Sequence, residues 1–538
     1  MTNILAAIGT PFIPSWDAPG YALRPFVAEL WLIAAIVAVL LAPFFTRRAN
    51  LVSGAVALTG VLLALISLFA VGPSDAGEHF RGLLVTDHVA VFWKALLLIF
   101  VAGVILLWCG TTSHFMHEGD GPEFFTLLLG ATLGMSLMAS TSNLLMFFVA
   151  IEMASLPSYV LAGFRKSNRL GAEAAMKYVL FGAASSSVMV YGLSILYGLY
   201  GSLQMADVAQ GIATADHGTA LAVVAVIALL VGLAFKIAAV PFHLWCPDVF
   251  EGASPDITVF LSVASKGAAI ILLLRVCLSL GAAYDFNPAP GITALAFAIG
   301  IVAAVTAFVG NTAAYAQNNI KRLLAYSSIA HAGYMLCAAS ILMHSAHAPG
   351  RFDPVVAATS PILLYLSVYM FMNLGAFAVV GIVYRETGKE TLDAYRGLGY
   401  RSPVAAAALT CALVSLIGLI PFAGFTAKLN ILVSLFQAGG WWWVLVGIIV
   451  TNTVVASFYY FRVIRAMYLE TPAPEDDRRY AGSPIGLGLA IVSAAMLFSM
   501  LILFSPLARL TTHFSQWSGL EPTPPSMVAP DAIVAEAR

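Results

Sequence analysis

The sequence has very few charged residues. Asp, Glu, Lys and Arg make up only 10% of its 538 residues, against about 25% in an average soluble domain. The 26 basic and 27 acidic residues nearly cancel, which excludes a basic nucleic-acid surface and the high net charge of a disordered chain. Hydrophobic residues make up 60%. These proportions exclude a large soluble enzyme and predict a polytopic helical membrane protein, because most of the mass must lie in the bilayer.

Cysteine is also scarce, and the five cysteines are far apart. None stands in a CxxC pair, so the sequence indicates neither an iron–sulfur cluster nor a zinc site. No GxGxxG follows a predicted strand and no GxxxxGK[ST] is present, so no dinucleotide or ATP site is predicted. We therefore expect neither a metal nor a cofactor in this chain.

Long apolar runs dominate what is present. A membrane-spanning helix needs about 20 mostly apolar residues, and fourteen runs come close to or exceed this length. The first run contains Glu29 and no small-residue cleavage site follows it, so we expect a retained helix rather than a signal peptide. The predicted spans are 26–45, 51–72, 88–110, 123–141, 143–164, 174–200, 219–242, 257–281, 291–313, 323–342, 357–384, 402–437, 440–464 and 484–508.

Lys and Arg gather on one side of these spans. The loops after odd-numbered spans carry fourteen of them, whereas the loops after even-numbered spans and the two termini carry five. Basic residues near span ends stay in the cytoplasm. Both termini are therefore predicted on the periplasmic side, which requires an even number of spans and agrees with the count.

Five charged residues lie among apolar residues within the spans. One is acidic, Glu152, and four are basic, Lys177, Lys236, Lys266 and Lys428. Each costs at least about 2.5–3.5 kcal/mol near the bilayer midplane. One carboxylate cannot neutralise four ammonium groups, and apolar residues would fill helix contacts at lower cost. We therefore interpret the five residues as a functional ion path.

Four further charges in the spans lie nearer to span ends. These are Glu29, Lys94, Arg275 and Arg462. Long side chains at such positions can reach the headgroup region. We expect them to be solvated and assign them no function.

Lysine and histidine suit proton transfer. The protonation of lysine responds to burial and to neighbouring charge, so a nearby carboxylate can make a lysine load or release a proton. Histidine can relay protons between lysines. His331 lies within a predicted span, and His243 follows Pro241 by two residues. Both are possible relays, although His243 could equally cap a helix end.

Prolines interrupt two of the lysine-bearing spans. Pro241 frees a backbone carbonyl next to Lys236, and Pro421 frees the carbonyl of Ile417 ahead of Lys428. Interrupted helices are tolerated at membrane depth where they face protein or a watery cavity. They also mark ion sites in transporters that are built from repeats.

The two breaks lie five spans apart, in the seventh and twelfth spans. We therefore predict two five-helix repeats, residues 123–281 and 282–470, which would be inverted because five is odd. Three helices in residues 1–122 precede them. A last helix in residues 471–510 and a flexible, proline-rich tail in residues 511–538 follow. The predicted fold class is an all-α polytopic membrane protein of about 14 transmembrane helices with broken helices 7 and 12.

Four segments carry a family resemblance. VPFHLWCPDVFEGASPDITVFLSVASKGAA closely resembles the seventh-to-eighth-span segment of the antiporter-like subunit N of respiratory complex I, the proton-pumping NADH–quinone oxidoreductase. KRLLAYSSIAHAGYML, AAMKYVLFGAASSSVMVYGLSILYG and IPFAGFTAKLNIL are similar to other segments of that subunit. The resemblance runs from about residue 85 to about residue 470.

The resemblance implies a function and a setting. Glu152 and the four lysines match the positions of the family's proton path. NADH, FMN, iron–sulfur clusters and quinone would be bound by partner subunits of complex I, and the chain would lie in a bacterial inner membrane. Lys266 in SVASKGAA favours subunit N, because the sister subunits L and M and the multisubunit sodium/proton antiporters typically have a histidine-containing sequence there. Ala427 and Leu429 depart from the usual glycine and aromatic residue around Lys428.

Three other interpretations stay open. A subunit of an Mrp-type cation/proton antiporter would show sodium-dependent antiport. A ferredoxin- or formate-linked relative of complex I would use the same pump with another electron donor, which neighbouring genes would reveal. A purely structural helical spacer is the weakest alternative, because it has no need of five charges inside its spans.

Overall fold

A computed structural model gives the structure of this chain. It describes residues 23–46, 48–71, 77–117, 119–165, 168–214, 219–283, 290–343, 353–471, 480, 483–515 and 517. Most of these residues are helical, and many of the helices are long and apolar. The predicted all-α membrane class is confirmed.

The N-terminal part consists of three long helices and a small hairpin. The hairpin joins α3 to α4, and its two strands are antiparallel with Glu78 opposite Val85. The elements are η1 (Arg24–Phe26), α2 (Val27–Phe45), α3 (Ala49–Val71), β1 (Gly77–His79), β2 (Leu84–Thr86), α4 (His88–Gly110) and η3 (Thr112–Phe115).

The next part contains the first interrupted helix, which consists of α9 and α10. It also contains a π-helical turn, η4, which lies directly before Lys266. The elements are α5 (Asp120–Ser140), α6 (Leu144–Ala162), α7 (Arg169–Tyr200), α8 (Met205–Thr214), α9 (Thr219–Ile237), α10 (Trp245–Gly252), α11 (Pro255–Phe260), η4 (Leu261–Ser265) and α12 (Lys266–Ala283).

The remaining part contains the second interrupted helix, α17 and α18. The elements are α13 (Pro290–Tyr315), α14 (Ile320–Ala339), η5 (Ser340–Met343), α15 (Pro354–Thr387), η6 (Leu392–Tyr395), α16 (Leu398–Arg401), α17 (Pro403–Ile417), α18 (Ala423–Ala438), α19 (Trp442–Leu469), α20 (Pro484–Ile502) and α21 (Phe504–His513).

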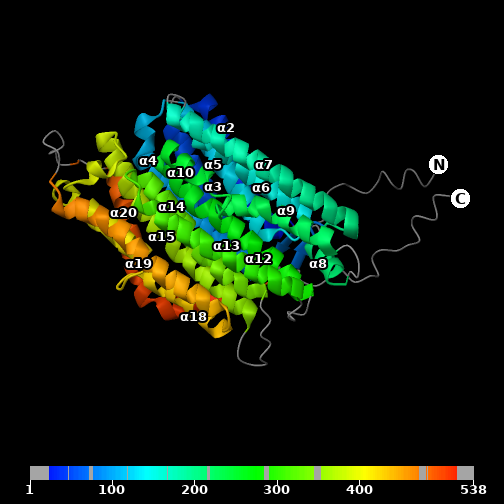
Figure 1. The fold of residues 1–538 in the computed structure, drawn as a ribbon. Helices are drawn as coiled ribbons and strands as arrows, with labels where there is room; N and C mark the ends of the chain where they lie inside the picture. Colours follow the sequence, from blue (N-terminus) through cyan, green and yellow to red (C-terminus); the bar gives the residue numbers. More distant parts are fainter. Residues whose placement is uncertain are drawn as a thin grey trace, which may run out of the picture.

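The long helices run side by side in roughly one direction (Figure 1). Helices α7 and α9 lie on one flank, α18 and α19 lie on the other, and α13, α14 and α15 lie between them. The most hydrophobic stretches of α11–α12 and α15 are completely buried, whereas those of α7, α13 and α19 are at most one-third buried. The interior of the bundle is therefore formed by α12, α14 and α15.

Every predicted span coincides with a helix or an interrupted helix. Twelve helices of the described residues are long and apolar enough to cross a membrane. The two other predicted spans correspond to α14, which carries several polar side chains, and to the pair α17 and α18. The number of membrane crossings and the two inverted repeats stay predictions.

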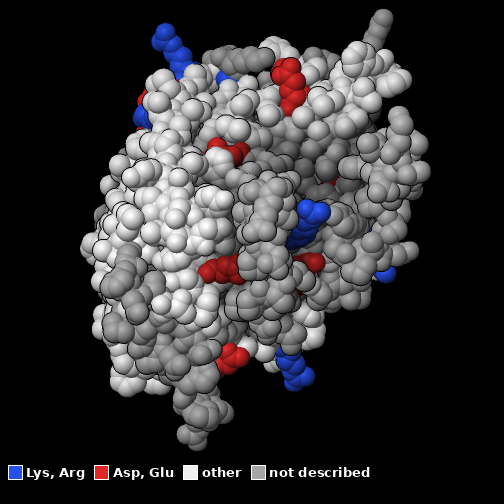
Figure 2. Space-filling view, turned by 90° about the vertical axis from the view of Figure 1, so that its right-hand side faces the viewer, with Lys and Arg blue, Asp and Glu red and all other residues white. Residues whose placement is uncertain are grey.

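The outer surface is poor in charge. Figure 2 shows few Lys, Arg, Asp and Glu side chains on one face, and a wide area at its left has described residues without these charges. Large apolar side chains such as Leu180, Val224 and Phe458 are more than half exposed. A surface of this kind suits contact with lipid or with other membrane subunits.

Asparagine side chains determine where three of the site helices begin. The Oδ1 atom of Asn143 accepts hydrogen bonds from two backbone N–H groups at the start of α6. Asn168 caps α7 in the same way, and Asn319 caps α14. Short polar side chains of this type satisfy N–H groups that have no partner inside a helix.

Two charges that we expected to be solvated are buried in ion pairs. Lys94 Nζ lies 2.7 Å from Glu29 Oε1, and the side chains are 6% and 0% exposed. Ser136 also donates to this carboxylate, at 2.6 Å. The prediction for both residues was wrong, because α2, α4 and α5 bring the opposite charges together.

Arg275 is a second correction. Its guanidinium lies 2.8 Å from Asp87 Oδ2, and its Nε donates to the carbonyl of Ala139 at 2.6 Å. Both charged side chains are almost fully buried. The side chain therefore points into the protein and does not reach the headgroups.

The predicted last helix and tail are only partly described. A helix over residues 484–508 was expected, and the structure has two helices there, α20 and α21, that meet at Leu503. Trp517 donates to Thr359 Oγ1 at 3.2 Å. Residues 516 and 518–538, the greater part of the predicted tail, lie outside the described residues.

Candidate functional site

The predicted site residues fall into a buried group and a partly exposed group. Lys236, Lys266 and Lys428 are 1%, 0% and 5% exposed. Glu152 and Lys177 are only partly buried, on the flank that carries α6 and α7. The two groups therefore have different surroundings.

Lys236 lies at the end of α9, directly before the first interruption. The helix ends at Ile237, Ala238 has a φ of 59°, and the chain becomes helical again at Trp245, so Pro241 lies in the connecting segment. The Lys236 ammonium has no hydrogen-bond partner among the described residues. It lies 5.6 Å from the ring centre of Tyr159.

Aromatic rings form the surroundings of Lys236. Its Nζ is also 5.5 Å from the ring centre of Tyr178. Tyr178 stacks on Trp245 of α10, with ring centres 4.3 Å apart and an angle of 11° between the rings. Trp245 Nε1 in turn donates to the carbonyl of Phe235 at 3.0 Å. The stacked rings thus connect α7, α9 and α10 around the lysine and favour a cation through their faces.

Lys266 lies in the centre of the bundle. Its ammonium donates to Ser328 Oγ of α14 at 2.6 Å and lies 3.6 Å from Cys246 Sγ of α10. The π-helical turn before it contains Ser262, whose hydroxyl is hydrogen-bonded to the side chains of Tyr369 and Asn373 of α15. π-helical turns are often found at functional positions in helices.

His331 lies one turn after Ser328 on α14. Its Nδ1 is 2.6 Å from the hydroxyl of Tyr365, and its ring packs against Tyr334. Electrostatic interactions connect it with both Lys266 and Lys428. His331 therefore lies near both lysines, and its role as a relay stays a prediction.

Lys428 lies just after the second interruption. Helix α17 ends at Ile417, Gly418 turns the chain with a φ of 86°, and α18 begins at Ala423. The Lys428 ammonium donates to the carbonyls of Leu416 at 3.0 Å and Ile417 at 2.7 Å. It also lies 4.9 Å from the ring centre of Tyr334. The lysine thus binds the carbonyls left without partners at the end of α17.

A chain of contacts links the three buried lysines in a row, and the part from Lys266 to Lys428 follows α14. The aromatic rings and Cys246 lie between Lys236 and Lys266, while Ser328, His331 and Tyr334 lie between Lys266 and Lys428. Hydroxyl groups, an imidazole and ammonium groups can each give up and accept protons. Such a row can carry protons or positive charge through a medium that otherwise excludes ions.

Glu152 and Lys177 do not pair with each other. Glu152 Oε1 accepts a hydrogen bond from Ser186 at 2.5 Å, and the carboxylate interacts electrostatically with Lys236. Lys177 instead lies 2.7 Å from Glu173 and 2.6 Å from Asp248. Glu152 therefore contacts neither Lys177 nor Lys236 directly and acts on Lys236 only through its charge.

An ion network around Asp248 was not predicted from the sequence. Arg322 at the start of α14 lies 2.7 Å from Asp248 Oδ1 and 2.6 Å from Glu251 Oε2. Lys321 pairs with Glu390 at 2.6 Å and is buried. Asp248 and Glu251 lie within the segment quoted above, but a short helix after a break is difficult to recognise from apolar periodicity.

His243 lies in the segment between α9 and α10 and is half-buried. Its Nδ1 atom has no hydrogen-bond partner among the described residues. Its carbonyl accepts from the backbone N–H of Cys246 at 3.0 Å. An electrostatic interaction connects the ring with Lys266. His243 therefore lies near Lys266, and its relay role stays a prediction.

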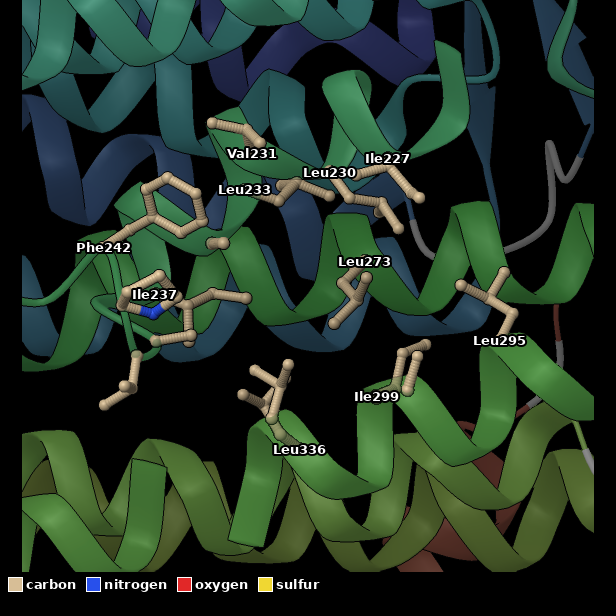
Figure 3. Close-up of a pocket in the computed structure, with 16 residues that line it drawn as sticks. Ile227, Leu230, Val231, Leu233, Ile237, Phe242, Leu273, Leu295, Ile299 and Leu336 are labelled. Atoms are coloured by element: carbon tan, nitrogen blue, oxygen red, sulfur yellow. The ribbon is translucent and has the colours of Figure 1, made fainter. Parts of the chain in front are cut away.

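A cleft of about 210 Å³ lies beside the row between α9, α12, α13 and α14. Its sixteen lining residues are all apolar, and Figure 3 shows Leu230, Leu273, Ile299 and Leu336 lying around it. Within the described ranges, no group of three or more His, Cys, Asp or Glu could hold a metal ion, and all five cysteines are free.

These features define a class of protein: a polytopic membrane protein whose buried lysines and interrupted helices suit ion translocation. Residues 141–455 match the family described as NADH:quinone oxidoreductase/Mrp antiporter, TM. The chain is 39% identical over 490 residues to NADH-quinone oxidoreductase subunit N of Anaeromyxobacter sp., covering 86% of this chain and 90% of that protein. The chain belongs to the NADH-quinone oxidoreductase subunit N family.

Solved structures show the same fold. A chain of respiratory complex I from Thermus thermophilus is 31% identical and superposes with a TM-score of 0.73, covering 90% of this chain and 99% of that one. A chain of the Mrp complex from Dietzia sp. has a TM-score of 0.75 at 19% identity, with 92% and 97% coverage. The second likeness concerns the fold alone.

Proposed function

We propose that the chain is a proton-translocating membrane subunit of a bacterial NADH-quinone oxidoreductase. Its membership of the subunit N family supports this function, as does the likeness to a chain of respiratory complex I. Other subunits of the complex are its partners, and the inner membrane is its location. NADH, FMN, iron–sulfur clusters and quinone are bound by those partners in this proposal, and both termini face the periplasm.

The row of buried lysines is the observation that carries the proposed path. Lys236, Lys266 and Lys428 come from three different helices, and α14 supplies Ser328 and His331 beside the last two of them. Burying three ammonium groups without three partner carboxylates is costly for folding alone. Glu152 and Lys177 extend the path towards α6 and α7, with His243 and His331 as relays.

Electrons are transferred in the partner subunits, so this chain needs only to respond to charge. A change in charge or conformation at one end of the row alters the proton affinity of the next lysine. Each lysine can then pass a proton to a neighbouring hydroxyl, imidazole or water. Charge interactions along the row thus connect remote redox chemistry to proton movement.

The central test replaces Lys266 by glutamine in the complete complex. Lys266→Gln keeps a polar side chain but removes the proton-carrying ammonium, so pumping should fall by roughly tenfold or more, as when an acid–base group is lost. The measurements are proton pumping in proteoliposomes, NADH–quinone turnover and subunit composition. Lys389→Gln changes an exposed lysine and serves as the matched control.

Two results would contradict the proposal. One is full pumping by an assembled Lys266→Gln complex. The other is pumping that requires sodium, which is tested by replacing sodium with choline in the same proteoliposomes and would favour the antiporter alternative.

A further inference from the structure

Asp248 lies where three helices of the proposed path meet. It belongs to α10, and its two carboxylate oxygens bind different cations. Oδ2 lies 2.6 Å from Lys177 Nζ of α7, and Oδ1 lies 2.7 Å from the guanidinium of Arg322 of α14. One carboxylate therefore connects a predicted path lysine to the helix that carries Ser328 and His331.

The two cations differ in one chemical property. Lysine can lose its proton, whereas arginine stays charged in proteins. If Lys177 becomes neutral, Asp248 keeps Arg322 as a partner and is not left as an unpaired carboxylate. Sharing the carboxylate therefore lowers the electrostatic cost of discharging the lysine.

The rest of the network keeps Arg322 in place. Arg322 also binds Glu251 at 2.6 Å, and its Nε donates to Gln317 Oε1 at 3.3 Å. Asn319 donates to Glu251 at 3.4 Å and to Glu390 at 3.3 Å. The guanidinium is thus held from α10 and from the loop before α14, so it provides a fixed positive charge beside Asp248.

Stability alone explains this arrangement poorly. The side chains of Lys177, Asp248 and Arg322 are 35%, 29% and 26% exposed, and ion pairs that retain this much solvent contribute little to folding. Glu173 is the other acid on Lys177, but it is 52% exposed and lies on the same helix. Among the described residues, Asp248 is the acid that ties Lys177 to another path helix.

Helix α10 also touches the centre of the row. Cys246 lies 3.6 Å from the Lys266 ammonium, and Trp245 stacks on Tyr178 next to Lys236. A shift of this eight-residue helix would therefore change the surroundings of Lys177, Lys236 and Lys266 together. Asp248 anchors α10 to α7 through Lys177 and to α14 through Arg322.

We propose, on the basis of the function argued above, that Asp248 is a positioning residue of the proton path. Its carboxylate holds Lys177 and shares its charge with Arg322, so that Lys177 can be charged or neutral without leaving the carboxylate unpaired. Asp248 is thus the carboxylate beside Lys177 that comes from another helix of the path.

The experiment compares pH profiles of proton pumping by the reconstituted complex. Asp248→Asn removes the negative charge beside Lys177 and should shift the profile to lower pH, because the ammonium then loses a stabilising partner. Arg322→Gln leaves the carboxylate to Lys177 alone and should shift it to higher pH. Glu173→Gln removes the other acid on Lys177, which is 52% exposed and therefore more strongly screened by water, and should shift the profile less.

A double variant tests whether Asp248 acts through Lys177. The Lys177→Gln and Asp248→Asn double variant should pump no worse than Lys177→Gln alone. A purely structural role predicts additive losses and no opposite pH shifts, and either result overturns the inference. If Asp248→Asn does not assemble, the comparison of Asp248→Glu with Arg322→Gln decides, since only the latter should move the profile.

The proposed function and this inference can fail separately. If Lys266→Gln pumps normally, the lysine row itself is refuted. If the Lys266→Gln complex assembles but does not pump, while Lys177→Gln and Asp248→Asn pump with the wild-type pH profile, only the role of Asp248 is refuted.

Discussion

The two interrupted helices hold their lysines in opposite ways. Lys428 follows its break and reaches back to the carbonyls of Leu416 and Ile417 at the end of α17. Lys236 precedes its break and has aromatic rings around it, with no hydrogen-bond acceptor among the described residues. A proline break alone therefore does not place a cation on the freed carbonyls.

The direction of the helix explains the difference. The C-terminal end of a helix exposes unpaired carbonyls and carries partial negative charge. A lysine on the next helix can approach that end from outside, as Lys428 does. A lysine in the last turn points away from the end of its own helix, because side chains tilt towards the N-terminus. Lys236 therefore depends on ring faces and on the more distant Glu152.

The largest expected effect is at Lys236. Lys236→Arg should be nearly as harmful to pumping as Lys236→Ala, with both losing roughly tenfold or more. Arginine keeps the charge but cannot release its proton. Pumping, turnover and assembly of the reconstituted complex are the measurements. Full activity of the arginine variant would leave only a fixed electrostatic role for this residue.

Lys428→Arg should be the milder substitution of the two. An arginine at this position can still donate to two carbonyls, so assembly should be normal and pumping should fall by about threefold to tenfold. Lys428→Met removes the donors as well and should be worse. Equal losses for arginine at both positions would show that the different surroundings of the two lysines have no functional consequence.

Removing the charge of Glu152 should have an intermediate effect. Glu152→Gln keeps the hydrogen bond from Ser186 possible and removes the acid that interacts electrostatically with Lys236. Because the two groups make no direct contact, we expect assembly to be intact and pumping to fall by about threefold. Pumping at the wild-type rate would refute the interaction between them.

The sequence predicts the features of these sites that depend on neighbouring residues in the chain, but not the contacts between distant helices. Spans and charges within them could be predicted, because apolar length and the cost of burying a charge are local properties. The freed carbonyl of Ile417 was also predicted, because the effect of a proline extends only one helical turn.

Partners across helices could not be predicted in this way. Glu29 and Lys94 are 65 positions apart, and Asp248 and Lys177 are 71 apart, so their pairing depends on how the helices pack. Each charge was judged by its distance from a span end alone. Lys94 and Arg275 were therefore expected at the membrane surface, although each has a buried partner.

Gly418 should tolerate alanine poorly for two reasons. Its φ is 86°, and a Cβ atom would lie 2.8 Å from Cδ of Lys428. We expect Gly418→Ala to destabilise this region by about 1–3 kcal/mol and to reduce pumping about twofold. The melting temperature of the purified complex and its pumping rate are the measurements.

Two glycine controls separate strain from crowding. Gly388 has a φ of 66° and open space around it, while Gly488 has open space without an unusual φ. If Gly388→Ala lowers pumping as much as Gly418→Ala does, backbone strain rather than contact with Lys428 is the cause. Gly488→Ala should change neither measurement.

The smallest effect is expected from the hydroxyl of Tyr178. This oxygen is buried and has no hydrogen-bond partner among the described residues, whereas the ring stacks on Trp245 and faces Lys236. Tyr178→Phe keeps the ring face and removes a buried polar atom without a partner, so pumping should stay within about twofold of wild type. Tyr178→Leu removes the ring and should lower pumping more. If Tyr178→Phe instead abolishes pumping, the hydroxyl itself takes part in the path, and the surroundings of Lys236 are less different from those of Lys428 than the contacts indicate.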